Sequence, residues 1–143
     1  MTLPSAVLFA CSMNSIRSPM AEGILKHLHG NRIYVDSVGV RAQDISGFAI
    51  AVMDEIGVDL RGHVAKTFDD LNDESYDLVI SLSPEAQHKA VDMTRTMACE
   101  VEYWQTFDAT AVEGSREECL AAYRGVRDAL MEKIRERFPP DED

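Results

Sequence analysis

The chain has 143 residues, 45% of them hydrophobic, which is enough for a single domain with its own apolar core. Its formal net charge of −11 at pH 7 argues against nucleic acid or an anionic membrane as the main partner, because no basic field attracts either one. The apolar run near the N-terminus is too short for a signal peptide or a membrane span, so a cytoplasmic location is the default expectation.

In the first half of the chain, apolar runs alternate with amphipathic segments. We expect strands at residues 6–10 and 33–38 and helices at residues 18–29 and 48–56, the second helix being closed by Gly57. The continuous apolar run of the first strand is typical of a strand that is covered on both faces. The first helix is expected to begin with Ser18 as its N-cap and Pro19 as its first helical residue.

The second half of the chain continues the alternation. Strands are expected at residues 78–82 and 101–104, and helices at residues 84–93 and 116–138. Strands that alternate with helices predict βαβ crossovers and a mainly parallel sheet, and therefore an α/β fold. No linker divides residues 1–138, which we expect to form one domain. The acidic residues 139–143, which begin with two prolines, are expected to be a disordered tail.

The turn after the first strand carries a cysteine and an arginine separated by five residues, Cys11 and Arg17. Ligands of open parallel sheets bind at the carboxyl ends of the strands, which is where this turn lies. The N–H groups of a tight loop and the N-terminus of a helix together bind anions. The guanidinium of Arg17 can hold two phosphate oxygens, while the same positive potential stabilises Cys11 as a thiolate nucleophile. A chance occurrence of the C-x5-R spacing, with Cys11 an ordinary buried thiol, is the alternative.

The predicted phosphate-binding residues are Ser12, Met13, Asn14, Ser15, Ile16 and Arg17. Two further contacts are hypotheses at this point. Ser18 would hydrogen-bond the Cys11 sulfur when it becomes a leaving group, and the Asn14 amide would brace the loop.

The segment from Val7 to Glu22 resembles the signature of the low-molecular-weight protein tyrosine phosphatases, a superfamily that includes the thioredoxin-coupled arsenate reductases. The similarity continues through residues 36–39, 56–63, 76–80 and 104–108 into the last helix, so it covers nearly the whole chain. It implies a three-layer α/β fold, in which helices flank a four-stranded parallel sheet and the phosphate loop joins the first strand to the first helix.

The resemblance also implies a function. A phosphatase of this family hydrolyses a phosphate monoester, such as protein phosphotyrosine or a related compound, through a phosphocysteine, here on Cys11. It needs no cofactor and no metal. The implied partner is a phosphorylated protein or small molecule, and the chain is expected to be a monomer or a weak dimer.

Two residues outside the loop take roles from the same resemblance. Asp108 matches the general acid, which protonates the leaving oxygen and then activates water. Ala109 follows it, where the family usually has proline, and a solvated loop aspartate or an N-cap is the alternative reading of Asp108. Ser37 would hydrogen-bond Asn14 and thereby hold the phosphate loop in shape.

The cysteines depart from the family pattern. Ile16 replaces the second cysteine that often precedes the arginine and protects the nucleophile as a disulfide. The thioredoxin-coupled reductases need two further cysteines after the third strand, but this chain has Ser83 there. Cys99 is expected to be a buried or idle thiol, and Cys119 to lie in the middle of a helix on a packed face. An internal cysteine relay for arsenate reduction is therefore not expected.

The aromatic residues that line the substrate groove of tyrosine phosphatases are missing from residues 40–44 and 109–111. Arg41 in the first stretch is instead a candidate for binding an anionic substrate. Two other functions stay open: an arsenate reductase that uses an external thiol such as glutathione or mycothiol, and a non-catalytic phosphate- or phosphoprotein-binding protein. The four histidines lack a metal-binding spacing, and we expect His63 to have a structural hydrogen-bonding role.

Overall fold

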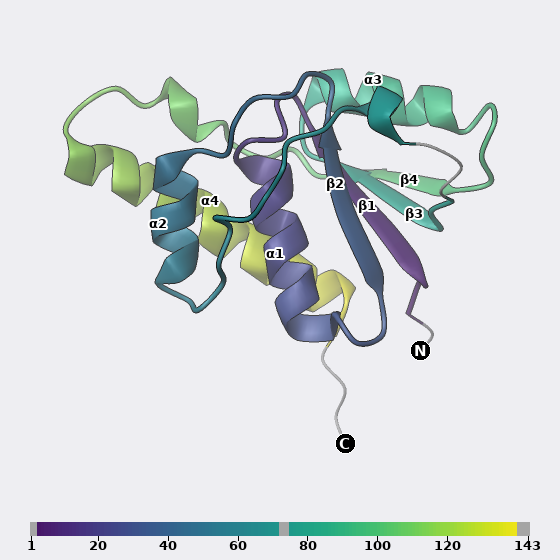
Figure 1. Cartoon of the computed structure of the whole chain (residues 1–143), viewed down its shortest axis with the longest axis horizontal. Helices are drawn as coiled ribbons and strands as arrows, with labels where there is room; N and C mark the ends of the chain where they lie inside the picture. The colour runs from purple at the N-terminus through teal and green to yellow at the C-terminus, as the bar shows by residue number, and fades with distance from the viewer. Residues whose placement is uncertain (1–2, 72–74, 140–143) are drawn as a thin grey trace.

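Four parallel strands form a single sheet in the computed structural model shown in Figure 1, in the order β2–β1–β3–β4. The structure describes residues 3–71 and 75–139. The strands are β1 (Ala6–Cys11), β2 (Tyr34–Gly39), β3 (Leu78–Ser81) and β4 (Glu100–Tyr103). The helices are α1 (Arg17–His29), α2 (Gly47–Asp54), α3 (Pro84–Met93) and α4 (Arg116–Arg137), with the short 3₁₀ turns η1 (Phe68–Asp70) and η2 (Ala109–Ala111).

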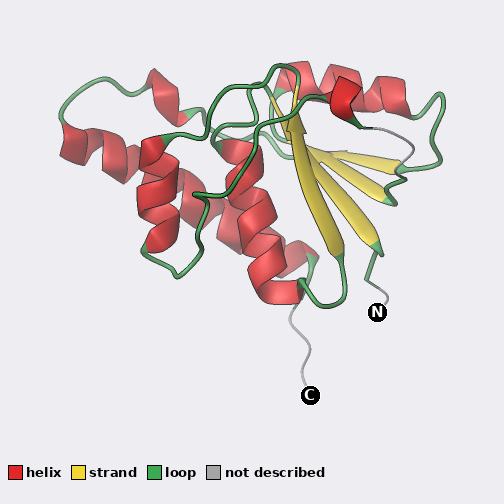
Figure 2. Cartoon of the chain, viewed as in Figure 1, coloured by secondary structure: helices red, strands yellow, loops and turns green. Residues whose placement is uncertain are grey.

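Helices cover both faces of the sheet. Side chains alternate along a strand, so that Val7 and Phe9 of β1 join the core beneath α1, α2 and α4. Leu8 and Ala10 point to the opposite face and pack with α3. Figure 2 shows this arrangement, with α3 on one side of the sheet and the other three helices on the other. The three-layer α/β fold expected from the sequence is thus confirmed.

The central strand β1 fixes the place of the residue at its end. It pairs with β2 on one side and with β3 on the other. The residues from Val7 to Ala10 are fully buried, and burying a large apolar side chain contributes about 1.5–3 kcal/mol. Cys11 is the last residue of this strand, so the best-anchored element of the sheet carries the predicted nucleophile.

The start of α1 differs from the prediction. The helix begins at Arg17, and Ile16 at the N-cap position makes no side-chain cap. The prediction that Ser18 is the N-cap is therefore wrong, because its hydroxyl turns toward Cys11 instead. The other α-helices of the described chain have serine caps, Ser46, Ser83 and Ser115. A helix without a side-chain cap leaves its first N–H groups available to a ligand.

The remaining boundaries lie within one or two residues of those expected. Among the described residues, no helix is long and apolar enough to cross a membrane. Residues 140–143, most of the tail expected to be disordered, lie outside the described part of the chain.

Candidate functional site

The phosphate loop, residues 11–17, turns from the end of β1 into the start of α1. Cys11 at its base is only 2% exposed. The segment after β2 binds four of the loop's carbonyl groups from outside. The N–H groups of Val40, Arg41, Gln43 and Ser46 donate, in that order, to the carbonyl groups of Cys11, Ser12, Met13 and Ser15. Carbonyl groups fixed in this way leave the inner side of the loop to its N–H donors, as an anion-binding loop requires.

Gly39 allows this close approach of the two segments. A Cβ atom at Gly39 would lie 2.3 Å from the carbonyl oxygen of Arg41 and 2.6 Å from the backbone nitrogen of Asn14. Both neighbours are backbone atoms, which cannot turn away as a flexible side chain would. A glycine at the end of β2 is therefore part of how the loop is shaped.

Asn14 is the structural centre of the loop. It is fully buried and adopts a left-handed backbone conformation with φ of 54°. Its side-chain nitrogen donates to the hydroxyls of Ser18 and Ser37, each at 2.9 Å. Its side-chain oxygen accepts from the backbone N–H of Lys66 and from His63 Nε2, each at 3.0 Å. All hydrogen-bonding positions of the amide are thus occupied, and this holds an otherwise unfavourable conformation. The expected contact between Ser37 and Asn14 is present.

The hydrogen bonds of Asn14 lead to the sulfur. Because the Ser18 hydroxyl accepts from Asn14, its own proton is available to Cys11 Sγ at 2.9 Å or to the Val38 carbonyl at 3.3 Å. The backbone N–H of Asn14 also donates to the sulfur, at 3.3 Å. The Cys11 sulfur thus lies within hydrogen-bond distance of the Ser18 hydroxyl and of the Asn14 N–H. Both groups are able to donate to a thiolate, the nucleophilic form of cysteine.

Glu22 and His63 complete the network on the far side of α1. The Ser37 hydroxyl donates to Glu22 Oε1, and His63 Nδ1 lies 3.9 Å from the same oxygen. His63 Nε2 faces the oxygen of the Asn14 amide, which only accepts, so this ring nitrogen carries the proton. Burial lowers the pKa of His63 despite the nearby Glu22 carboxylate, which favours the neutral ring at neutral pH. His63 thus has the structural hydrogen-bonding contact that was expected of it.

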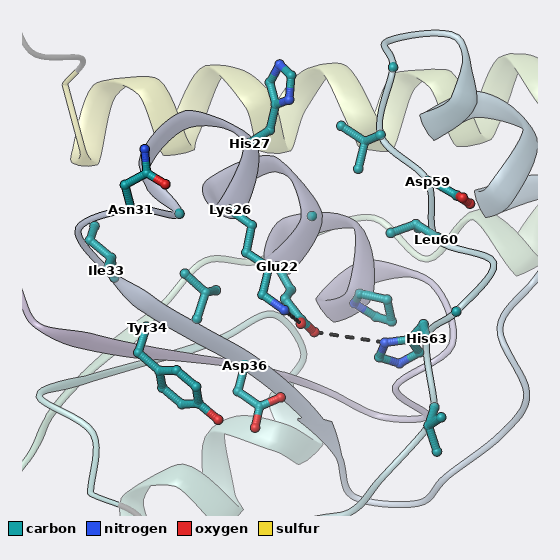
Figure 3. A pocket seen from close by; sticks show the side chains of 18 of the residues that line it. Glu22, Lys26, His27, Asn31, Ile33, Tyr34, Asp36, Asp59, Leu60 and His63 are labelled. Carbon is teal, nitrogen blue, oxygen red and sulfur yellow. Dashed lines mark hydrogen bonds and ion pairs between the residues drawn. The ribbon is translucent and has the colours of Figure 1, made fainter.

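A pocket of about 900 Å³ lies beside this end of the network, as Figure 3 shows. Glu22 and His63 line it, whereas Cys11 and Arg17 do not, so it is separate from the phosphate loop. Lys66 also lines this pocket, and its Nζ atom pairs with Asp36 Oδ1 at 2.5 Å. Burial is the largest single influence and opposes the charge of Lys66, but the hydrogen bond to Asp36 and the charges of Asp36 and Glu22 together outweigh it, so the pKa of Lys66 is raised.

Arg17 is held in place by the loops that follow β3 and β4. Its side chain is 11% exposed, and its NH1 group donates to the carbonyl of Thr106 at 3.2 Å and to that of Leu82 at 3.5 Å. The NH2 group lies 4.0 Å from Asp108 Oδ2. A guanidinium anchored in this way at the first residue of α1 can offer its remaining donors to an oxyanion in the loop.

Asp108 lies on the acid loop, residues 104–111, and half of its side chain is exposed. Its Oδ1 atom accepts hydrogen bonds from the N–H and the hydroxyl of Thr110, so it caps η2. Burial acts to raise the pKa of Asp108, but the hydrogen bonds from Thr110 and the charge of Arg17 outweigh it and lower the pKa. Asp108 is therefore both an N-cap and a neighbour of the phosphate loop.

The other two cysteines make no contact with Cys11. Cys99 immediately precedes β4 and lies at the amino edge of the sheet, opposite the phosphate loop, and burial raises the pKa of its thiol. Cys119 is half-buried in the first turn of α4, so the expectation of a mid-helix position is wrong. Ser83, at the position of a relay cysteine, has its hydroxyl 3.1 Å from that of Ser12.

No group of three His, Cys, Asp or Glu side chains that could hold a metal ion occurs within residues 3–71 and 75–139. The sequence reasoning did not single out Glu22, although it lies one helical turn after Ser18 and shares its face of α1. It also missed Phe107, which is 58% exposed immediately before Asp108 and supplies an aromatic ring to the acid loop.

Comparisons with known proteins identify related chains. The family model for low molecular weight phosphotyrosine protein phosphatases matches residues 6–138. An arsenate reductase from Bacillus subtilis is 32% identical over 130 residues, which make up 91% of this chain and 92% of that protein. A glutaredoxin arsenate reductase from Synechocystis sp. is 42% identical over 76 residues, or 53% of this chain and 58% of that protein. A solved arsenate reductase in its phosphate-binding state has a TM-score of 0.72 at 31% identity, covering 93% of this chain and 95% of that one.

Proposed function

The chain belongs to the low molecular weight phosphotyrosine protein phosphatase family, and within this family we propose that it reduces arsenate with electrons from an external thiol. The observation that carries the proposal is the position of Cys11 Sγ, within hydrogen-bond distance of the Ser18 hydroxyl and of the Asn14 N–H, in a loop suited to a tetrahedral oxyanion. This choice reverses the order of preference in the sequence analysis, where phosphate monoester hydrolysis came first. Similarity to arsenate reductases over nine-tenths of the chain supports the change.

The chemistry proceeds in three steps. The Cys11 thiolate attacks arsenic(V) in the loop, an As–S bond forms, and one arsenate oxygen leaves as water after protonation. An external thiol then attacks the Cys11 sulfur, so that a mixed disulfide forms and the electron pair of the As–S bond leaves with arsenic as arsenite. A second thiol attacks this disulfide and frees Cys11. Two thiols are oxidised to one disulfide for each arsenate that is reduced.

The need for an external thiol follows from the positions of the cysteines. Cys99 lies at the opposite edge of the sheet, and Ser83 occupies the position beside Ser12 where a relay cysteine would stand. A mixed disulfide on Cys11 therefore has no neighbouring thiol within the described part of the chain that could resolve it.

The environment of Asp108 favours arsenate over a phosphate ester. A general acid must carry a proton when the leaving group departs, and the hydrogen bonds from Thr110 keep the pKa of Asp108 low. An ester oxygen has no proton of its own to leave with, whereas arsenate carries ionisable hydroxyl groups. Arsenate reduction therefore depends less on this carboxyl group.

Hydrolysis of a phosphate monoester is the second candidate, and one observation favours it. Asp108 Oδ2 lies 4.0 Å from the guanidinium of Arg17, the group that would hold the phosphoryl oxygens. In this reaction Cys11 attacks phosphorus and Asp108 protonates the leaving oxygen. The same carboxylate then activates the water that cleaves the phosphocysteine.

A paired assay decides between the two candidates. One arm measures oxidation of glutathione by the purified chain with and without arsenate, and the other measures metal-free hydrolysis of para-nitrophenyl phosphate between about pH 5 and pH 8. We expect arsenate-dependent thiol oxidation that disappears in Cys11→Ser. Hydrolysis without arsenate reduction with any thiol would overturn the proposal in favour of the phosphatase. Phosphate binding without either reaction would indicate the non-catalytic binding protein.

A further inference from the structure

Two charged side chains face each other beside the phosphate loop. Arg41 follows β2, and Glu85 lies in the first turn of α3. The NH1 and NH2 groups of Arg41 donate to separate carboxylate oxygens of Glu85, each at 2.8 Å. The two side chains are 54% and 42% exposed, so the pair is open to solvent and to a ligand.

Ser12 ties this ion pair to the reactive cysteine. The backbone N–H of Arg41 donates to the Ser12 carbonyl at 2.8 Å, and the hydroxyl of Ser83, two residues before Glu85, lies 3.1 Å from the Ser12 hydroxyl. Ser12, the residue that follows Cys11, therefore contacts both segments that carry the ion pair. The pKa of Glu85 is lowered first by Arg41, with smaller contributions from Ser12 and the charge of Arg17, which agrees with a carboxylate at the edge of the loop.

A charged ligand can replace the partners in this ion pair. An exposed ion pair adds little to stability, so its opening costs little. An anionic ligand alone would bind Arg41 only in competition with Glu85, in a chain whose net charge of −11 already repels it. A ligand that carries both an anionic and a cationic group replaces both partners at once and leaves no charge unpaired.

We propose that Arg41 and Glu85 form the recognition site for the external thiol, and that this thiol is a small molecule bearing both a carboxylate and an ammonium group. The inference rests on the proposed function, which requires a thiol to reach the Cys11 sulfur. The carboxylate of the thiol binds the guanidinium of Arg41, and its ammonium group binds Glu85. Its sulfur is thereby brought to the mouth of the loop beside Ser12.

Disulfide exchange in the absence of arsenate tests this recognition. The Cys11 thiolate attacks oxidised glutathione, forms a mixed disulfide and releases one glutathione thiolate, so that no other oxidant is needed. Intact-mass spectrometry gives the second-order rate of adduct formation. Hydroxyethyl disulfide, which carries no charge, gives the reference rate for each variant, and the ratio of the two rates reports charge recognition alone.

We expect Arg41→Gln to lower the ratio of the glutathione rate to the hydroxyethyl disulfide rate by about five- to tenfold. Arg61→Gln is the matched control, because Arg61 also pairs with a carboxylate, Asp59, on the surface but contacts no loop residue. This control is expected to keep the wild-type ratio. An unchanged ratio in Arg41→Gln would overturn the proposal.

A second probe separates recognition by two charges from attraction of any anion. Dithiodiglycolate carries carboxylates but no ammonium group. With this disulfide, Glu85→Gln should raise the exchange rate about fivefold, because Arg41 is released from its partner, while Arg41→Gln should lower it. With oxidised glutathione, Glu85→Gln should lower the rate, because the ammonium group loses its partner. The same direction of change with both disulfides would contradict the two-charge site. Because these assays contain no arsenate, they can fail or succeed independently of arsenate reduction.

Discussion

The phosphate loop and the acid loop differ in how firmly they hold their polar groups. Asn14 is fully buried, and its amide makes four side-chain hydrogen bonds to residues of α1, β2 and the segment before η1. Asp108 is half exposed, caps a single 3₁₀ turn and lies 4.0 Å from its nearest cation, Arg17. The side chains around Cys11 are therefore held in a preorganised arrangement, whereas the carboxylate of Asp108 is not. A reaction that depends mainly on the nucleophile and the oxyanion site suits this division best.

The largest effect is expected from loss of the nucleophile. Cys11→Ser should lower turnover by a factor of about 10⁴ or more, because a serine hydroxyl in this loop is a far weaker nucleophile than a thiolate. Binding of inorganic phosphate, measured by titration calorimetry, should persist, since Arg17 and the loop N–H groups remain. Turnover within tenfold of wild type would show that another residue attacks the substrate.

Asp108→Asn should lower the rates of the two candidate reactions to different extents. Hydrolysis of para-nitrophenyl phosphate should fall by about 10²–10⁴-fold, because the variant has no proton to give. Arsenate reduction should fall by less than about tenfold in the same variant. Equal losses in both reactions would mean that the acid loop is as essential for arsenate as for an ester.

Thr110→Val tests the cause of the low pKa of Asp108. The variant removes the hydroxyl that donates to Asp108 Oδ1 at 2.6 Å, so the pKa of the carboxyl should rise toward its ordinary value. A general acid acts while it is protonated, so the alkaline limb of the hydrolysis profile should move to higher pH. An unchanged pH profile would argue that Asp108 is not the acid.

Asn14→Ala should weaken the framework of the phosphate loop itself. The variant removes four hydrogen bonds and forces alanine into the left-handed region, so we expect a loss of about 2–4 kcal/mol in the free energy of unfolding. Asn14→Gly removes the same amide but accepts the backbone conformation, and it should recover about 1 kcal/mol of that loss. Urea unfolding measures both variants. Equal stabilities of the two would mean that the positive φ imposes no strain.

The smallest effect concerns the contact between the loop and the end of β2. Gly39→Ala places a Cβ atom 2.6 Å from the backbone nitrogen of Asn14, and we expect a loss of about 1–3 kcal/mol together with weaker phosphate binding. Gly47→Ala is the control, because a Cβ atom there meets nothing within 4 Å, and it should change stability by less than about 1 kcal/mol. Equal stability of the two variants would contradict the role given to Gly39.

Local patterns in the sequence predicted much of this account. The alternation of strands and helices, the parallel sheet and the position of Cys11 and Arg17 at a strand-to-helix turn follow from apolar runs and turns, which act over short distances along the chain. The layers were implied by the family resemblance, and the order of the strands in the sheet was not predicted. The mistaken N-cap at Ser18 had a tertiary cause, because its hydroxyl is engaged by Cys11 and Asn14 rather than by the helix N-terminus.

Contacts between residues far apart in the sequence could not be predicted from local sequence patterns. His63 and Asn14 form a hydrogen bond although they are 49 residues apart in the sequence, and Glu85 and Arg41 do so at a separation of 44 residues. No spacing rule along a helix or strand connects such residues, because folding of the whole sheet brings them together. The charge pair beside the phosphate loop is therefore a product of the tertiary structure.

The most direct test of the account is a single-turnover experiment that traps the intermediate on Cys11. The wild-type chain is mixed with arsenate and one equivalent of glutathione, quenched with acid, and analysed by intact-mass spectrometry with peptide mapping. We predict a glutathione disulfide on Cys11 that forms only when arsenate is present, together with one equivalent of arsenite. Arsenite formation without this adduct, or an adduct that maps to Cys99 or Cys119, would contradict the central claim that Cys11 passes electrons from an external thiol to arsenic.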